Sequence, residues 1–197
     1  MKNLVTLRFM LISLFAAMSM VMNAEVIEYS TTDGFKYKLD TETKTAVLSR
    51  YSGSATEVVV PASVTYKNTE YSVTSLGDHC FELCSSLTIN IPSSVTSFGK
   101  NCFQYCFSLT SVNIPSSVTS LGNECFNGCS SLTSINIPSS VTSLGNGCFK
   151  QCTSLTSITI PFSCSLTSLG DNCFWHCSSL TSITIPSSVT SLGNYCF

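Results

Sequence analysis

Charged side chains are scarce in this chain of 197 residues. Lys and Arg together number 9 and Asp and Glu 11, so charged residues make up 10% of the sequence and the net charge is −2. The region from residue 85 to residue 197 is poorer still, because its only charged residues are Lys100, Glu124, Lys150 and Asp171. A chain without a basic excess has no electrostatic footprint for nucleic acid, which excludes that class of partner.

Motifs of catalysis and of cofactor binding are also missing. The two histidines, His79 and His176, stand in no motif with a nucleophile or a recurrent acidic partner. The sequence has no phosphate-binding glycine loop and no cluster of carboxylates, which makes a hydrolase of β-helical architecture a remote alternative. We therefore expect no enzymatic activity, no cofactor and no metal.

Long apolar stretches are absent after the first 24 residues. Before that point, Lys2 and Arg8 precede the apolar run 9–22, and a polar sequence begins at Glu25. A basic start followed by a short apolar core is typical of a secretory signal peptide, whereas a membrane-spanning helix needs about 20 apolar residues. The sequence predicts a signal peptide over residues 1–24, export, and no integral membrane segment once this leader is removed.

Only six prolines occur, and all of them belong to an internal repeat. They stand at positions 61, 92, 115, 138, 161 and 186, in steps of 31, 23, 23, 23 and 25 residues. A period of this length is the signature of a repeat architecture. One coil buries too few side chains to offset the entropy of ordering it, so neighbouring coils have to stack into a solenoid.

The first half of each unit has the pattern of a short strand. In the copy at 129–149, Leu132, Ile135 and Ile137 are spaced L-x-x-I-x-I, and the last three of these positions alternate as a strand with one buried face. Pro138 then ends the strand, because proline has no backbone N–H to donate to a neighbour. Stacked in register, these strands are expected to form a continuous parallel sheet.

The second half of the unit returns the chain to the next coil. Val141 and Leu144 are predicted to point inward along an extended return, and Gly145 to permit the turn that follows. Cys148 and Cys152 are four residues apart, which predicts one side of a short helical or 3₁₀ turn. Each coil is thus predicted to run strand, turn, extended return and helical turn.

These residues resemble the BspA-like class of leucine-rich repeats, known from bacterial and protist surface proteins. The class signature is close to L-T-S-I-x-I-P-x-S-V-T-S-I-G-x-x-A-F-x-x-C, and it is followed almost throughout by the copies that start at Leu109, Leu132, Leu155 and Leu180. The resemblance implies a repeat solenoid with a parallel sheet on its concave face and a role in adhesion. The chain departs from the class Ala before Phe at Cys80, Cys102, Cys125, Cys148, Cys173 and Cys196.

The residues ahead of the repeats predict an N-terminal cap. Segments 35–39 and 45–48 alternate polar and apolar residues around a polar turn, which is a β-hairpin signal. A degenerate first strand follows at 55–61, and then an insertion at 66–71. We predict a β cap over residues 25–54 and a leucine-rich-repeat solenoid over 55–197. Because the last repeat is cut midway, the chain is expected to be part of a longer protein.

Twelve cysteines recur mainly as Cys-x-x-x-Cys pairs, as at 102/106 and 148/152. A bridge within one pair fits disulfide geometry poorly, so we favour small buried thiols, with disulfides between coils as the alternative and zinc a distant third. Cys164 lies in a two-residue insertion without a repeat counterpart. It is either a surface thiol or the inward equivalent of Val141.

Two surfaces are candidates for ligand binding. The outward positions of the strands form a nearly uncharged ladder on the expected concave face: Asn90, Asn113, Asn136, Thr159 and Thr184. The other candidate is the variable turn, where Tyr105, Phe107 and Trp175 replace the small or polar residues of other copies, and large aromatics dominate interface energies. The alternatives are that the ladder serves only solubility and that the aromatics pack on a neighbouring coil.

We interpret the sequence as a non-enzymatic recognition or adhesion module, secreted or displayed at the cell surface. Its expected partners are protein or glycan ligands on host or microbial surfaces. A structural spacer that extends another domain is the main alternative. An ice-binding solenoid is a second one, although the mixture of Asn and Thr in the ladder argues against it.

Overall fold

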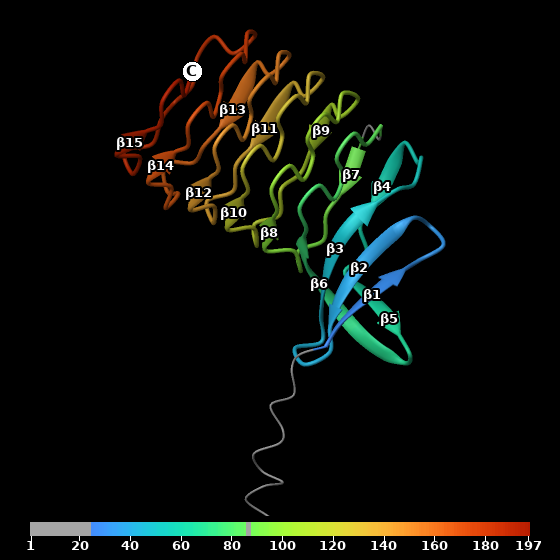
Figure 1. The fold of residues 1–197 in the computed structure, drawn as a ribbon. Helices are drawn as coiled ribbons and strands as arrows, with labels where there is room; N and C mark the ends of the chain where they lie inside the picture. Colours follow the sequence, from blue (N-terminus) through green and yellow to red (C-terminus); the bar gives the residue numbers. More distant parts are fainter. Residues whose placement is uncertain (1–24, 86–87) are drawn as a thin grey trace, which may run out of the picture.

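The computed structural model describes residues 25–85 and 88–197, and the predicted signal peptide lies outside them. The described chain is all β: a stack of coils with a twisted β cap at its N-terminal end (Figure 1). Within these residues, no helix has the length and apolar character needed to cross a membrane. The predicted solenoid with an N-terminal β hairpin is therefore confirmed.

The cap is a meander of three antiparallel strands, β1 (Val26–Ser30), β2 (Phe35–Asp40) and β3 (Thr45–Tyr51). Alternation along β2 places Phe35, Tyr37 and Leu39 in the core and the two intervening lysines in solvent. This two-residue period is what the sequence predicted for the hairpin.

The insertion after the first degenerate strand is a second hairpin. It consists of β5 (Ser63–Tyr66) and β6 (Thr69–Leu76), joined by Lys67 and Asn68, which both have positive φ as a tight hairpin turn requires. β6 pairs in parallel with β3 on one side and with residues 97–98 of the following coil on the other. The hairpin thus connects the hydrogen bonding of the cap to that of the solenoid.

The segment predicted as an extended return is a paired strand in every coil. It forms β8 (Ser97–Phe98), β10 (Ser120–Leu121), β12 (Ser143–Leu144), β14 (Ser168–Leu169) and β15 (Ser191–Leu192). These strands pair in parallel and continue the cap sheet along one edge of the stack (Figure 1). In the inner coils Leu or Phe faces the core and Ser faces outward, so the longest sheet of the molecule runs through this return.

The predicted L-x-x-I-x-I strands lie along the opposite edge (Figure 1). They are β4 (Glu57–Val59), β7 (Thr88–Asn90), β9 (Ser111–Val112), β11 (Ser134–Asn136) and β13 (Ser157–Thr159). The expected single sheet is divided into β4-β7-β9 and β11-β13. A long bond joins the segments of β9 and β11, from the Thr133 N–H to the Thr110 carbonyl at 3.4 Å. Such short strands, each followed by proline, leave few donors to maintain the sheet.

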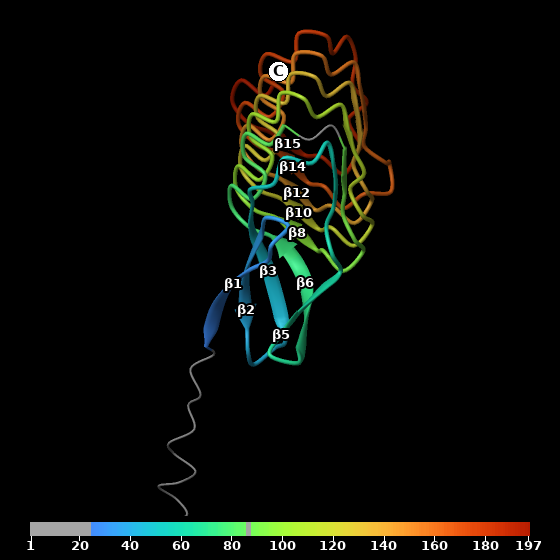
Figure 2. The same ribbon diagram turned by 90° about the vertical axis from the view of Figure 1, so that its right-hand side faces the viewer.

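A column of phenylalanine rings forms the centre of the core. Phe103, Phe126 and Phe149 stack face to face with their counterparts in adjacent coils, at centroid distances of 5.0 Å and 5.4 Å and with interplanar angles of 2° and 3°. The column extends to Phe81 at one end and to Phe197 at the other. Figure 2 shows the backbone of the coils stacked one above another. Because the rings repeat in register, each coil presents nearly the same apolar face to the next.

Candidate recognition surface

The segment around each Cys-Phe pair makes two successive tight turns, each closed by a hydrogen bond between residues three apart, and no continuous helix. The α-helical form of the predicted helical or 3₁₀ turn was therefore wrong. In one coil, Lys150 donates its N–H to the Gly147 carbonyl at 3.0 Å, and Cys152 donates to the Phe149 carbonyl at 3.2 Å. Gly147 and Gln151 both adopt positive φ, which interrupts any helical path. Most other coils repeat this pair of left-handed positions, at 79/83, 101/105, 124/128 and 172/176.

These turns are held to each other by backbone hydrogen bonds. Gly147, Phe149 and Gln151 donate their N–H groups to carbonyls of the following coil at 2.7 Å, 2.9 Å and 2.8 Å. The same alternating pattern joins 101–105 to 123–127 and 124–128 to 146–150. The turns therefore form a rigid side of the solenoid, and their side chains occupy fixed places from coil to coil. We call the surface formed by segments 78–83, 100–107, 123–130, 146–153 and 171–178 the turn face.

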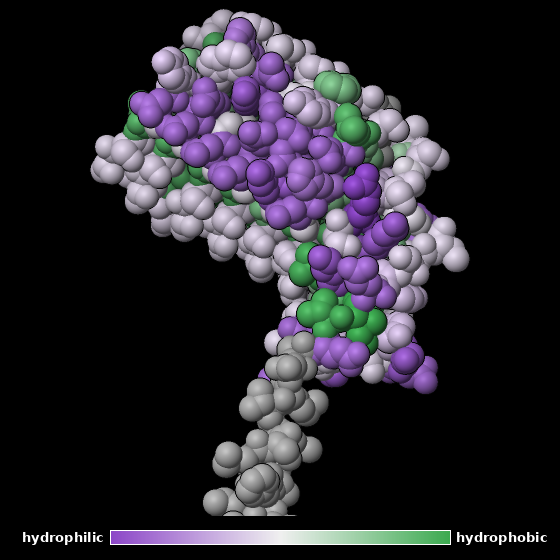
Figure 3. Space-filling model, in the orientation of Figure 1, coloured by the Kyte–Doolittle hydropathy of each residue, from purple (hydrophilic) through white to green (hydrophobic). Residues whose placement is uncertain are grey.

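The turn face carries the charge of the repeats. All four charged residues between 85 and 197, namely Lys100, Glu124, Lys150 and Asp171, lie in its segments, as do Asp78 and Glu82 of the first coil. Figure 3 shows the corresponding concentration of strongly hydrophilic residues as a band across the coils. The other two sides of each coil carry mainly Ser, Thr and Asn.

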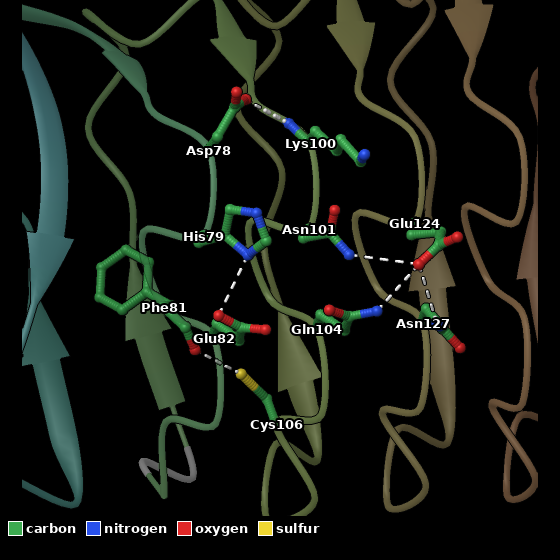
Figure 4. A network of polar contacts seen from close by, with 10 residues as sticks. All are labelled: Asp78, His79, Phe81, Glu82, Lys100, Asn101, Gln104, Cys106, Glu124 and Asn127. Atoms are coloured by element: carbon green, nitrogen blue, oxygen red, sulfur yellow. Dashed lines mark hydrogen bonds and ion pairs between the residues drawn. The ribbon is translucent and has the colours of Figure 1, made fainter.

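A cluster around Glu124 is the most connected part of this face (Figure 4). Its Oε2 atom accepts hydrogen bonds from Asn101 Nδ2 at 3.2 Å, Gln104 Nε2 at 2.9 Å and Asn127 Nδ2 at 3.3 Å. The three amide side chains are buried, with exposures of 4%, 7% and 3%, and they come from two neighbouring coils. Sequence reasoning missed this cluster, although its only signal, polar residues of different kinds at equivalent turn positions, was visible.

A second carboxylate contact lies one coil nearer the cap. The Nδ1 atom of His79 is 3.0 Å from Glu82 Oε2, and both side chains are at least partly accessible to solvent. Figure 4 shows this pair beside the Glu124 cluster, with Asn101 between them. The turn face therefore presents an ordered row of polar groups across its first three coils.

Tyr105 and Phe107 form an aromatic pair next to the polar row. Their rings stack at 5.7 Å with an interplanar angle of 27°, and Phe107 is 54% exposed. Tyr105 is half-buried because its ring lies over Gly128 of the next coil, where any Cβ would overlap it. Leu83, at the position equivalent to Tyr105 in the preceding coil, is 64% exposed. Tyr105 thus packs on a neighbouring coil and also supports an exposed apolar patch formed by Leu83, Tyr105 and Phe107.

Trp175 lies on the same face but farther along the stack. Its ring is half-buried, lies 5.0 Å from Lys150 Nζ of the preceding coil, and meets the His176 ring edge-on at 3.7 Å. Two coils separate it from Tyr105. The structure consequently places the three predicted aromatics on one surface without bringing Trp175 into contact with the other two.

The predicted ladder occupies a different side of the coils. All five of its residues are exposed, and the strand register pairs Asn136 with Thr159 directly. At the cap end, Asn90 Nδ2 donates to Glu57 Oε1 at 3.1 Å. The outward orientation predicted for these residues is therefore correct, whereas their role in binding remains a prediction.

A second ladder, which the sequence did not reveal, follows the glycine of each coil. The Asn146 N–H binds Asn123 Oδ1 at 2.9 Å, the Asp171 N–H binds Asn146 Oδ1 at 3.0 Å, and the Asn194 N–H binds Asp171 Oδ1 at 2.6 Å. At the cap end the Lys100 N–H binds Asp78 Oδ1 at 2.7 Å. Each side chain thus satisfies a backbone donor of the following coil.

The repeat glycine is needed for close approach and not for an unusual turn. Gly145 does not have positive φ, but a Cβ at this position would lie 2.5 Å from the Asn123 nitrogen of the preceding coil. Gly122 is confined in the same way, 2.5 Å from the carbonyl carbon of Gly99. The sequence correctly predicted that glycine is needed here, but it predicted a turn where the structure shows close contact between coils.

None of the twelve cysteines forms a disulfide, and all except Cys84 and Cys177 are buried. Cys164 is the inward equivalent of Val141: its N–H bonds the Pro161 carbonyl at 3.1 Å, as the Val141 N–H bonds Pro138 at 3.1 Å. Among the described residues, no group of three or more His, Cys, Asp or Glu is arranged to hold a metal ion.

A comparison with known families identifies the repeat. The family profile described as "BspA type Leucine rich repeat region" matches residues 74–197 in six copies. The chain belongs to this family. No curated protein sequence matches the chain.

Solved structures of bacterial leucine-rich-repeat proteins are similar to this family member. A leucine-rich cell surface protein from Faecalibacterium prausnitzii is 30% identical with a TM-score of 0.68, and the match covers 88% of this chain and 52% of that one. A leucine-rich repeat protein from Bacteroides capillosus is 29% identical with a TM-score of 0.62, over 68% of this chain and 98% of that one. The pneumococcal vaccine antigen PcpA, 20% identical with a TM-score of 0.74 over 85% and 46% of the two chains, shares the fold. The chain thus spans about half the length of the Faecalibacterium protein.

Proposed function

We propose that this BspA-type repeat protein is a non-enzymatic recognition module, exported and displayed outside the cell, which binds protein or glycan ligands on host or microbial surfaces through its turn face. The observation that carries the proposal is the concentration on that face of large side-chain differences between coils and of all four charged residues of the region 85–197. A partner can distinguish one place on a repetitive solenoid from another only where the coils differ.

The two sheet-bearing sides of the coils are less suited to recognition. On the return side, Thr142 Oγ1 donates to the Thr119 carbonyl at 3.2 Å, and Ser140 Oγ donates to the Val118 carbonyl at 2.6 Å. On the strand side, Thr156 Oγ1 donates to the Thr133 carbonyl at 3.0 Å. Because many of these hydroxyls already bond the preceding coil, they serve the stacking of the solenoid.

The apolar patch of Leu83, Tyr105 and Phe107 supplies the anchor that a specific interface needs. Exposed aromatic side chains lose little conformational entropy on binding, and burying one fully contributes about 1.5–3 kcal/mol. The adjacent polar row, from His79 to Asn127, is held in place by the hydrogen bonds around Glu124. An apolar anchor beside preorganised polar groups favours specificity at low cost in ordering.

Export and surface display are supported by two independent observations. Residues 1–24 have the composition of a secretory leader, and the Faecalibacterium relative is described as a cell surface protein. The repeat architecture and the absence of catalytic motifs in the sequence both support binding over catalysis.

The test is binding of the chain without residues 1–24 to immobilised extracellular matrix proteins, mucin and whole bacterial cells. We expect binding to at least one of these surfaces and its loss in the double variant Tyr105→Gln, Trp175→Lys. Both substitutions introduce residues that equivalent positions carry in one of the two coils between them, Gln151 and Lys150, so the fold should be retained. Circular dichroism checks that it is.

Two outcomes would contradict the proposal. No binding to any of the three surfaces would favour a structural spacer. Binding that is unchanged in the double variant would remove Tyr105 and Trp175 from the interface and direct attention to the strand ladder.

A further inference from the structure

The feature that recognition leaves unexplained is the burial of so many thiols in a chain with an export leader. Two columns run through the core: the first column is Cys80, Cys102, Cys125, Cys148, Cys173 and Cys196, and the second column is Cys84, Cys106, Cys129, Cys152 and Cys177. Cys102, Cys106, Cys125 and Cys129 have exposures of 0%.

The second column uses its thiol hydrogens in the structure. Cys106, Cys129 and Cys152 donate Sγ–H to the carbonyls of Phe81, Phe103 and Phe126 of the preceding coil, at 2.9 Å, 3.1 Å and 3.1 Å. Cys177 repeats the contact with Phe149 at 3.0 Å. A sulfur in a disulfide has no hydrogen to donate, so oxidation would remove a recurring link between coils.

The first column is protected by its place in the core. Burial, and after it the neighbouring thiols, hold the pKa of Cys102, Cys125 and Cys148 well above the ordinary range. Disulfide exchange requires a thiolate that is accessible to the oxidant. In the folded chain ten of the twelve thiols are buried and not accessible to an oxidant. The unfolded chain exposes all twelve and allows thiols four residues apart to meet in small loops.

We propose that the cysteine columns make folding of the solenoid conditional on the redox state: the chain folds only as the thiol form, and the fold then shields the columns from disulfide oxidants. In the competing reaction, two protein thiols and one small-molecule disulfide give one protein disulfide and two small thiols, through a mixed disulfide. Such a bond within a pair, or between distant coils, prevents the register that the columns require.

The first experiment changes the order of folding and oxidation in the wild-type chain. Urea-unfolded, reduced protein is diluted into buffer with either dithiothreitol or oxidised glutathione, and a third sample is folded in reductant before the oxidant is added. We expect the β-sheet circular dichroism signal in the first and third samples and its loss in the second, with recovery when dithiothreitol is added later. Equal signals in all three samples would overturn the proposal.

The second experiment measures thiol accessibility in the folded protein with an aromatic disulfide reagent that releases a coloured thiolate. We expect Cys84 and Cys177 to react first, because they alone among the twelve are partly exposed. The remaining thiols should react at least ~100-fold more slowly, at the rate of local or global opening. Rapid labelling of most of the twelve thiols in the folded protein would overturn the proposal. Neither experiment depends on the proposed ligand recognition.

Discussion

Some glycines of this protein are required because the backbones of neighbouring coils approach too closely to admit a Cβ atom. A Cβ at position 122 would lie 2.5 Å from the backbone of Gly99, so the two coils have to move apart to admit it. Gly147 differs, because its φ of 61° is shared by Asn101 and Glu124 at equivalent positions, and its nearest neighbour is a flexible side chain. The two glycines therefore differ in how well they tolerate substitution by a larger residue.

We expect Gly122→Ala to lower the free energy of unfolding by roughly 3 kcal/mol, because the clash is with backbone atoms that cannot relax locally. Gly147→Asn is the matched control and should change it by less than about 1 kcal/mol, since Asn tolerates the left-handed conformation. Urea unfolding followed by circular dichroism gives both values. A loss for Gly122→Ala no greater than that of the control would contradict the close-approach explanation.

Glu124 is expected to stabilise the turn face through the hydrogen bonds that it accepts from three side-chain amides. Glu124→Gln keeps the shape and removes the charge, so the hydrogen bonds to Asn101, Gln104 and Asn127 weaken and the free energy of unfolding should fall by about 1–3 kcal/mol. Glu82→Gln is the control: Glu82 contacts one side chain, His79, where Glu124 contacts three, so this substitution should lower the free energy of unfolding by less than half as much. Equal changes in the free energy of unfolding for the two variants would show that the Glu124 cluster stabilises the fold no more than the His79–Glu82 contact does.

At the residue scale, the sequence predicted which side chains are inward more reliably than why they are there. The inward positions of Ile135 and Val141 follow directly from the two-residue period and the repeat. The position of Cys164 was left open between two interpretations, because an insertion removes the repeat register that would decide it. Glu124 was not predicted, since two of its three partners come from the preceding coil and variation between copies does not show which side chains meet.

At the scale of single elements, the ladder that follows the repeat glycine can be improved. Asn123, Asn146 and Asp171 each accept a hydrogen bond from a backbone N–H of the next coil. Lys100 occupies the equivalent position in the coil before Asn123, and a lysine side chain has no acceptor atom. The ladder is consequently interrupted between Lys100 and Asn123.

Lys100→Asn should restore the ladder and raise the free energy of unfolding by about 0.5–1 kcal/mol, the net contribution of one hydrogen bond. Asn146→Ala should lower it by a similar amount, because the Asp171 N–H loses its acceptor. Urea midpoints of the two variants, measured side by side, should move in opposite directions. A destabilised Lys100→Asn variant would show that the lysine has a role that the ladder does not explain.

The turn after the repeat glycine is the element that the sequence predicted wrongly. A spacing of four residues places two side chains on one face of a helix, but two tight turns with left-handed residues at Gly147 and Gln151 do the same. The short strands of the return were likewise missed, because their pairing depends on the stacking of coils and not on local propensity. The cap hairpin was predicted correctly, since its alternation is long enough to be read locally.

At the scale of the whole molecule, the buried thiols predict sensitivity to alkaline pH under reducing conditions. Burial raises the pKa of Cys125 and Cys148 above the ordinary value near 9, and that of the less buried Cys177 to about 11. Below pH 8 the thiols stay protonated in both the folded and the unfolded chain, so their contribution to the free energy of unfolding is fully present. Above pH 9 the unfolded chain releases protons that the folded chain retains, so the free energy of unfolding falls as the pH rises.

Each buried thiol should contribute at most about 1.4 kcal/mol per pH unit to this loss. We expect the urea midpoint, measured with reductant present, to stay constant from pH 7 to pH 8 and to fall steeply above pH 9. A constant midpoint up to pH 10 would mean that the thiols are not buried as described.

The overall architecture was the most predictable feature of all. A 23-residue period with fixed Pro, Gly and Phe leaves a stacked solenoid as the one way to bury every coil, and six matched copies of the BspA-type repeat agree with it. The recognition surface was only partly predictable. Variation between copies indicated the turns, but the exposure of Leu83 and Phe107 depends on how the coils stack.

The central claim, that ligands are recognised by the turn face, is tested most directly by comparing two matched variants against one bound surface. The turn-face variant carries Leu83→Gln, Tyr105→Gln and Phe107→Ser, and the strand-face variant carries Asn113→Thr and Asn136→Thr, all residues found at equivalent positions of other coils. With the surface that wild type binds best, the account predicts at least about a tenfold loss of affinity for the first variant and less than about a twofold change for the second. A tenfold loss in the strand-face variant, with the turn-face variant unchanged, would contradict it.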